Sequence, residues 1–211
     1  MNLCTCPAAA SLTSIPAAGC PESFGQIQKI AFPRLRKADG TKNSFTSTSS
    51  ILIKASWTAK MAASDATKIV ISPYIQAPSQ EAGSPRTFGG GNETLGGVEI
   101  IIGREPSTFT GVIRSVSQDV IKAMKQLQCE AQADNLGVFL IDENGAVEAI
   151  KDESVATTFY PIPIRSLFIG DKAHGGLEAP DSNAIQFSFL PNYSDNLSIQ
   201  VPTDFNPLTD L

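Results

Sequence analysis

The chain has 211 residues, of which 42% are hydrophobic and 18% are charged, with a formal net charge of −5. An acidic balance disfavours tight binding to nucleic acid, which requires clustered lysine and arginine against the phosphates. No run of about 18 apolar residues predicts a membrane span. The N-terminus also lacks the basic region and apolar stretch of a secretory signal, so we expect synthesis and residence in the cytoplasm.

Residues 1–23 show neither strand nor helix periodicity and contain Pro7, Pro16 and Pro21. Such a segment is predicted to be an N-terminal arm without structure of its own. It can be ordered along its own domain or across a neighbouring subunit, and we favour the neighbour because arm exchange locks an assembly. Residues 24–211 are predicted to form a single β-rich domain.

Cysteines occur at positions 4, 6, 20 and 129. A zinc site is disfavoured, because structural sites prefer Cys-x₂₋₄-Cys pairs and only Cys4-x-Cys6 is present. Reduced thiols are expected. A Cys6–Cys20 or Cys4–Cys20 disulfide would require that the finished product lives outside a cell.

In chain order, residues 24–32 predict a first strand, rich in β-branched and aromatic residues. Alternation from Ile51 to Trp57 predicts a second strand with one buried face. A short helical turn is expected over residues 60–66. A further strand over 68–75 ends at or soon after Pro73.

Residues 76–97 are rich in glycine and proline and predict a long loop. A loop of this length inside a compact domain is expected to be functional or to become ordered on a partner. Strands are predicted over residues 98–103 and 109–114 on either side of the next turn region.

An amphipathic helix is predicted from Ser117 to about Cys129. Ser117 is the expected N-cap, Asp119 complements the helix dipole, and Val116 is placed to contact Ile121. The apolar stripe, formed by Val120, Ile121, Met124 and Leu127, predicts a helix that lies on a β-sheet.

Residues 137–150 predict a hairpin in which Asn144-Gly145 forms a type I′ turn. Residues 158–169 are also strand-like, and Pro161 and Pro163 indicate a sheet edge or a bulge. Alternating Ile185, Phe187 and Phe189 predict a strand with one buried face, and a last short strand covers 197–201.

The sequence gives no sign of catalysis. His174 is the only histidine and lies in a glycine-flanked loop, without the Gly-x-Ser-x-Gly motif of a nucleophilic serine. Gly89–Gly91 lacks the spacing of a phosphate-binding loop. The expectation is therefore a protein that is not an enzyme, uses no cofactor or metal, and binds or assembles instead.

Together these elements predict a mainly β fold, a β-sandwich or barrel-like domain with one flanking α-helix and an extended N-terminal arm and loops. Four segments carry a resemblance to a known family: Thr87–Ile100, Ser117–Cys129, Gly137–Gly145 and Ile185–Phe189. In this order they resemble phage major tail tube proteins and their Hcp-like relatives in contractile injection systems. They are also similar to structural proteins of phages that infect Bacteroides-type bacteria.

The resemblance implies a virion structural protein, assembled in the host cytoplasm. As in that family, its protomers are expected to form hexameric rings that stack into a tube, and double-stranded DNA would pass through the tube without sequence-specific binding. Its partners would be other copies of itself and other tail or virion proteins. The arm 1–23 and the loop 83–97 would contact neighbouring subunits, with Phe24, Phe88, Asn92 and Leu95 as contact residues.

The same resemblance implies an acidic lumen, for which the candidate residues are Glu93, Glu99, Asp171 and Glu178. Two alternatives stay open. One is another virion part, such as a capsid decoration or head–tail connector protein. The other is a ligand-binding β-sandwich module, which would be expected to expose aromatic residues on one sheet face.

Overall fold

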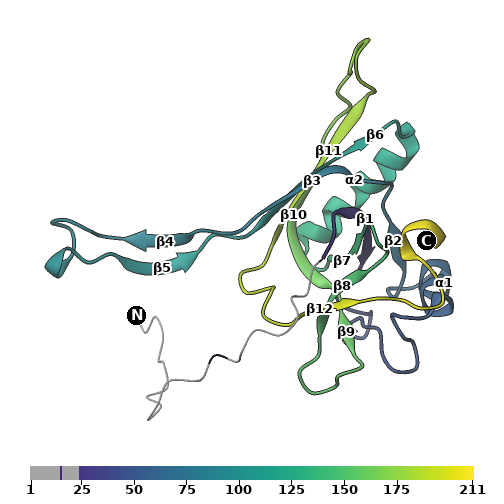
Figure 1. The fold of residues 1–211 in the computed structure, drawn as a ribbon, viewed down its shortest axis with the longest axis horizontal. Helices are drawn as coiled ribbons and strands as arrows, with labels where there is room; N and C mark the ends of the chain where they lie inside the picture. Colours follow the sequence, from purple (N-terminus) through teal and green to yellow (C-terminus); the bar gives the residue numbers. More distant parts are fainter. Residues whose placement is uncertain (1–14, 16–23) are drawn as a thin grey trace. The chain divides into compact units, whose positions relative to one another are not determined.

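The computed structural model describes Ile15 and residues 24–211 (Figure 1). The chain divides into two units, which are described separately. The body comprises Phe24–Gly83 and Pro106–Leu211, and the hairpin unit includes Ser84–Glu105. The predictions for the N-terminal arm and for Cys4, Cys6 and Cys20 lie outside the described residues.

The body is mainly β, as predicted. Its strands and helices, in chain order, are β1 (Ile27–Pro33), α1 (Lys54–Ala62), β2 (Ile69–Ile71), β3 (Gln76–Glu81), β6 (Thr108–Arg114), α2 (Gln118–Gln132), β7 (Gly137–Asp142), β8 (Val147–Lys151), β9 (Phe159–Tyr160), β10 (Ile162–Ile169), β11 (Ser182–Phe189), β12 (Leu197–Gln200) and α3 (Pro207–Asp210).

Strand β7 is the centre of the sheet. The main strand order is β12-β8-β7-β10-β11-β6-β3, and β7 also pairs with β1, which in turn pairs with β2. The first residues of β7 pair with β10, and Leu140 and Ile141 pair with β8. All pairings of β7 are antiparallel. One strand therefore joins the part of the sheet that contains β8 to the part that contains β10.

Both faces of β7 are covered, and each face contributes to a different core. The first core lies on the side of Val138 and Leu140 and includes the aromatic residues Phe109, Phe187 and Phe189. The second core lies on the side of Phe139 and Ile141 and includes Phe45, Trp57 and Phe159. Since neighbouring side chains of a strand point to opposite faces, burial on both faces explains why β7 is a continuous apolar run.

Helix α2 packs beside β10 and covers the first core, with Ile121, Met124 and Ala131 buried. Ser117 occupies the N-cap position, as predicted, although its side chain makes no capping hydrogen bond. Val120, which was expected in the apolar stripe, is 37% exposed. The helix therefore contacts the sheet along the line through Ile121 and Met124.

The predicted strand from Ile51 to Trp57 was wrong, because Lys54–Ala62 forms helix α1. The segment contains Ala55, Ala59 and Ala62, which favour a helix, and this propensity prevails over a short apolar alternation. Trp57 is fully buried and its indole Nε1 donates a hydrogen bond to the Ile51 carbonyl, 2.8 Å away. This contact fastens the helix to the second core.

The hairpin β7–β8 was predicted correctly, but its type I′ turn was wrong. Gly145 has a φ of +82°, whereas Asn144 is not among the residues with positive φ. The Gly145 amide donates to the Asp142 carbonyl (3.1 Å), and the Asp142 amide donates to Ala146 (3.0 Å). These bonds describe a type I turn followed by a glycine bulge. Asp142 Oδ1 stabilises it by accepting from the amides of Asn144 and Ala146.

Pro161 lies between β9 and β10, and Pro163 lies within β10. The register of β10 against β11 shifts between Arg165 and Phe168, so β10 contains a bulge, although it lies beyond the two prolines from which a bulge was predicted. The alternative of an edge strand was wrong, since β10 pairs with β7 on one side and β11 on the other.

Phe139 ties the second core together, because its ring meets Phe45 and Trp57 at centroid distances of 5.4 Å and 5.6 Å. We expect Phe139→Ala to lower the free energy of unfolding by roughly 3–5 kcal/mol, through lost burial and the cavity left behind. Urea denaturation measures this. Phe168→Ala is the control, since Phe168 is 54% exposed and should cost little. Equal losses in the two variants would contradict the assignment of this core.

Glu148 of β8 faces the first core, whereas its neighbours Val147 and Ala149 face the second core. Burial raises the pKa of its carboxyl to about 7. A pKa raised by folding adds stability below the unfolded value, and this stability is lost as the pH rises through 7.

We therefore expect the free energy of unfolding to fall by roughly 2 kcal/mol between pH 5 and pH 8, a figure discounted for the partial exposure of the carboxyl. Glu148→Gln should remove most of this slope, because its amide does not titrate. The exposed neighbour provides the control, Glu143→Gln. Urea denaturation at both pH values is the measurement, and an unchanged slope in Glu148→Gln would contradict the assignment.

Candidate assembly site

The hairpin unit contains two strands, β4 (Pro85–Phe88) and β5 (Ile100–Arg104), which pair with each other as a separate two-stranded sheet. The predicted loop over residues 76–97 was therefore wrong in part, because it contains β3 and β4. These strands were not predicted because they contain proline and mostly polar residues. Pro78 is tolerated because β3 is a strand at the sheet edge, paired only with β6 among the described strands.

Apolar side chains lie on both faces of the hairpin. Phe88 is opposite Ile100, and Thr87 is opposite Ile101. These two pairs are neighbours along the strands, so they point to opposite faces. A register shift between Arg86 and Thr87 accommodates the additional residue in β5, Ile102.

The turn that joins the two strands is organised around Thr94. Its hydroxyl accepts a hydrogen bond from the Gly90 amide (3.1 Å) and donates one to the Val98 carbonyl (2.7 Å). Gly89 has a φ of +88°, and a Cβ there would lie 2.1 Å from the Thr94 methyl carbon. Glycine is therefore required at position 89 for the turn to close on Thr94.

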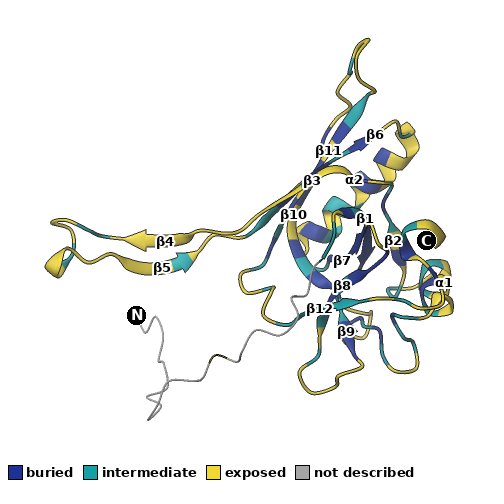
Figure 2. Cartoon of the chain, in the orientation of Figure 1, coloured by how far each residue is buried: buried dark blue, intermediate teal, exposed yellow. Residues whose placement is uncertain are grey.

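The large apolar side chains of the hairpin unit are exposed, and Figure 2 shows β4 and β5 as mostly exposed strands. The exposed fractions range from 47% to 102% over Phe88, Leu95, Val98, Ile100, Ile101 and Ile102. An isolated two-stranded hairpin is marginally stable in water. Apolar side chains exposed on such a hairpin are candidates for contact with a partner.

The structure places four of the expected contact and lumen residues in the turn of this hairpin or beside it. Asn92, Glu93 and Leu95 are exposed in the turn, and Glu99 is exposed directly before β5. Phe88, the last residue of β4, is 56% exposed. The hairpin thus brings together apolar and acidic candidates.

The other candidates belong to the body. Phe24 is partly buried and packs against the first core. Asp171 and Glu178 are exposed between β10 and β11, and Asp171 forms an ion pair with Lys125 that lowers the pKa of its carboxyl. Asp171 and Glu178 therefore share one loop that is separate in sequence from the hairpin.

The sequence analysis did not identify Val98 and the three isoleucines of β5 as part of an exposed apolar surface. It identified a strand here and gave it no role. An available signal was the run Ile100-Ile101-Ile102, which is apolar on both faces like a buried strand, yet is flanked by glycine-rich and proline-containing segments.

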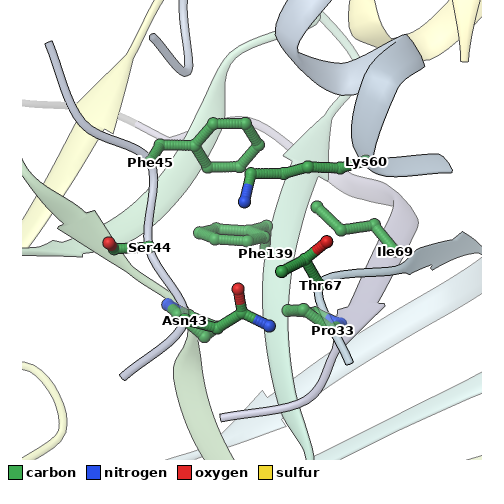
Figure 3. Close-up of a pocket in the computed structure, with 9 residues that line it drawn as sticks. Pro33, Asn43, Ser44, Phe45, Lys60, Thr67, Ile69 and Phe139 are labelled. Carbon is green, nitrogen blue, oxygen red and sulfur yellow. The ribbon is translucent and has the colours of Figure 1, made fainter. Parts of the chain in front are cut away.

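One small cavity of the body lies beside a partly buried lysine. Figure 3 shows the side chains of Asn43 and Lys60 beside a small cavity that Phe45 and Phe139 also line. Its volume of about 10 Å³ is about that of one water. Burial lowers the pKa of the Lys60 ammonium. The cavity is too small for a substrate.

Groups with metal or catalytic potential are scattered. Nδ1 of His174 lies 3.2 Å from Asp181 Oδ1, but the histidine side chain is 79% exposed. Cys129 is a free, exposed thiol. Within residues 15 and 24–211, no group of three or more potential metal ligands is present. Among the helices of this same part, none combines the length and apolarity of a membrane span.

The three isoleucines of β5 do not belong to either core. We therefore expect the triple change Ile100→Thr, Ile101→Thr and Ile102→Thr to leave the free energy of unfolding of the body within about 0.5 kcal/mol of the parent. Threonine retains the β-branched preference for a strand. Binding of a hydrophobic fluorescent dye should fall at the same time. Thermal denaturation and dye titration measure the two effects, and a large loss of stability would assign the isoleucines to the core.

Comparison with known proteins gives no family-model match and no match among curated proteins. Several solved structures are similar. One is from the tail of an empty gene transfer agent particle with C6 symmetry, with 14% identity, 60% of this chain and 82% of that chain covered, and a TM-score of 0.33. A chain of the six-fold symmetrised baseplate of the anti-feeding prophage is 8% identical. The match covers 92% of this chain and 100% of that chain, with a TM-score of 0.33.

A crystal structure of Hcp protein is also similar, with 12% identity. The match covers 77% of this chain and 88% of that chain, with a TM-score of 0.24. These solved structures come from a gene transfer agent tail, a prophage baseplate and an Hcp protein. At these TM-scores they do not establish a shared function, and they give no support to a Bacteroides-type phage.

Proposed function

We propose that this chain is a virion structural protein that assembles with copies of itself into stacked, hexameric rings of a tail tube. The observation that carries the proposal is the β4–β5 hairpin, whose apolar side chains are exposed on both faces. A surface of this kind is stabilised when neighbouring subunits cover it. The resemblance of the sequence to tail tube proteins supplies the kind of assembly.

The hairpin is suited to contact a neighbouring subunit on each face. The pair Phe88–Ile100 presents one apolar surface, and Ile101 presents another. Burial of apolar area stabilises such contacts by roughly 25 cal/mol per Å² before the costs of association. Arg86 and Glu105 form an ion pair of 3.6 Å at the base of the hairpin.

Sheet edges provide a second means of association. β3 and β12 terminate the main strand order, and each pairs on one side only among the described strands. Unpaired edges readily accept a strand from another chain, and closure of a ring removes them. The body can therefore associate laterally while the hairpin reaches a further subunit.

Under this proposal, double-stranded DNA passes through the tube without sequence-specific binding. The net charge of −5 and the exposed carboxylates of Glu93, Glu99, Asp171 and Glu178 support it, because negative charge repels the phosphates. A density map of the assembled tube that placed all four on its outer wall would exclude their role in the lumen.

Assembly is tested with Ile101→Asp, which introduces a charge into the apolar surface of β5. We expect rings and tubes from the parent and a loss of assembly in the variant, because a carboxylate buried in the contact would be unpaired. Mass photometry followed by negative-stain microscopy is the measurement.

Val155→Asp is the matched control, since Val155 is 50% exposed, Ile101 is 62% exposed, and Val155 belongs neither to the hairpin nor to a strand that terminates the sheet. The control should assemble like the parent. A parent that stays monomeric at micromolar concentration would contradict the proposal and favour a ligand-binding β-sandwich module. Closed rings that never stack would favour a head–tail connector.

A further inference from the structure

A second site lies in the body, at a cavity of about 320 Å³ beside the edge strand β3. Its lining residues are Phe24, Gly25, Gln26, Ile27, Pro78, Ser79, Gln80, Phe109, Glu148 and Tyr193. The volume falls in the range of pockets that hold a small ligand or a long side chain. This cavity is formed within the body alone and shares no residue with the hairpin.

The cavity combines aromatic walls with a single carboxylate. Phe24, Phe109 and Tyr193 supply the rings, and Glu148 supplies the only carboxyl group among the lining residues. Among the described residues, this carboxyl makes no hydrogen bond or ion pair. Its desolvation is uncompensated, and burial accordingly raises its pKa to about 7.

Tyr193 is held in place at the rim of the cavity. Its ring stacks on Phe189 with a centroid distance of 4.4 Å, and the Gln80 amide donates a hydrogen bond to its hydroxyl. Burial and the neighbouring Glu148 charge raise the pKa of the phenol, so it stays neutral near pH 7. Among the described residues that line the cavity, Tyr193 is the only other titratable group.

An unpartnered carboxylate between aromatic rings is complementary to an organic cation. Aromatic faces attract an ammonium or guanidinium group, and they also accommodate the apolar stem of lysine or arginine. We propose that this cavity binds a lysine or arginine side chain from a second copy of the chain, with Glu148 as its counter-ion.

The position of the cavity supports a second copy as the source. Ser79 and Gln80 form part of its rim and belong to β3, whose other edge is unpaired among the described strands. A second copy that approaches this edge would bring its side chains to the cavity mouth. The choice of a second copy as the occupant rests on the self-assembly proposed above. The binding of a cation by the cavity does not depend on that self-assembly.

The chemistry is tested on the full chain with n-butylamine hydrochloride, which imitates a lysine side chain, and with n-butanol as its uncharged match. Carbon-detected NMR of the glutamate carboxyls follows the titration. We expect n-butylamine to bind and to lower the pKa of Glu148, and n-butanol to bind far more weakly.

Because the cation requires ionised Glu148, the affinity for n-butylamine should be roughly tenfold lower at pH 6 than at pH 8. Glu148→Gln should abolish this binding, and Glu143→Gln, which changes an exposed carboxyl nearby, should retain it. Equal binding of n-butanol, or full binding by Glu148→Gln, would overturn the cation site.

The source of the cation is tested by assembly of the same two variants at pH 8. A second copy as occupant predicts weaker assembly for Glu148→Gln than for Glu143→Gln in mass photometry. Equal assembly of both would overturn the second copy as the source. If the parent itself does not assemble, the proposed function fails, while the n-butylamine titration still decides the cation site.

Discussion

Burial of β7 on both faces is the constraint on which the rest of the structure depends. Because Val138 and Leu140 face one core while Phe139 and Ile141 face another, other parts of the chain must cover the sheet on two sides. Helix α2 covers the first core, and α1 contributes Trp57 to the second. The three pairings of β7 also connect the two parts of the sheet, so loss of this strand would separate them.

The hairpin unit contrasts with the body in one physical respect. In the body, most apolar strand residues are covered by the chain itself, whereas in β4 and β5 they are left exposed. A run such as Ile100–Ile102 has the composition of a buried strand, and we propose that a neighbouring subunit supplies its cover. This difference between composition and exposure is what supports assembly rather than catalysis as the function.

The two proposed contact sites use different forces. The hairpin offers apolar area, which is insensitive to pH, whereas the cavity at Glu148 offers one desolvated charge whose ionisation changes near pH 7. Apolar burial contributes most of the stability of an interface, and a buried charge pair contributes specificity and orientation. Together they would make association both strong and sensitive to the protonation of one carboxyl.

By itself the sequence determined the mainly β class, α2 with its N-cap at Ser117, the hairpin β7–β8, and the strand containing Phe187, because each has a local period or turn signal. It did not determine α1, since Ile51–Trp57 alternates like a strand. It also did not determine the type of the β7–β8 turn, in which Gly145 has a positive φ and Asn144 does not, because the Asp142 carboxylate stabilises a different turn. Only the tertiary structure decided that Ile101 is exposed and that Glu148 is desolvated. Both depend on which residues distant in sequence do or do not cover a side chain, and no local pattern carries that information.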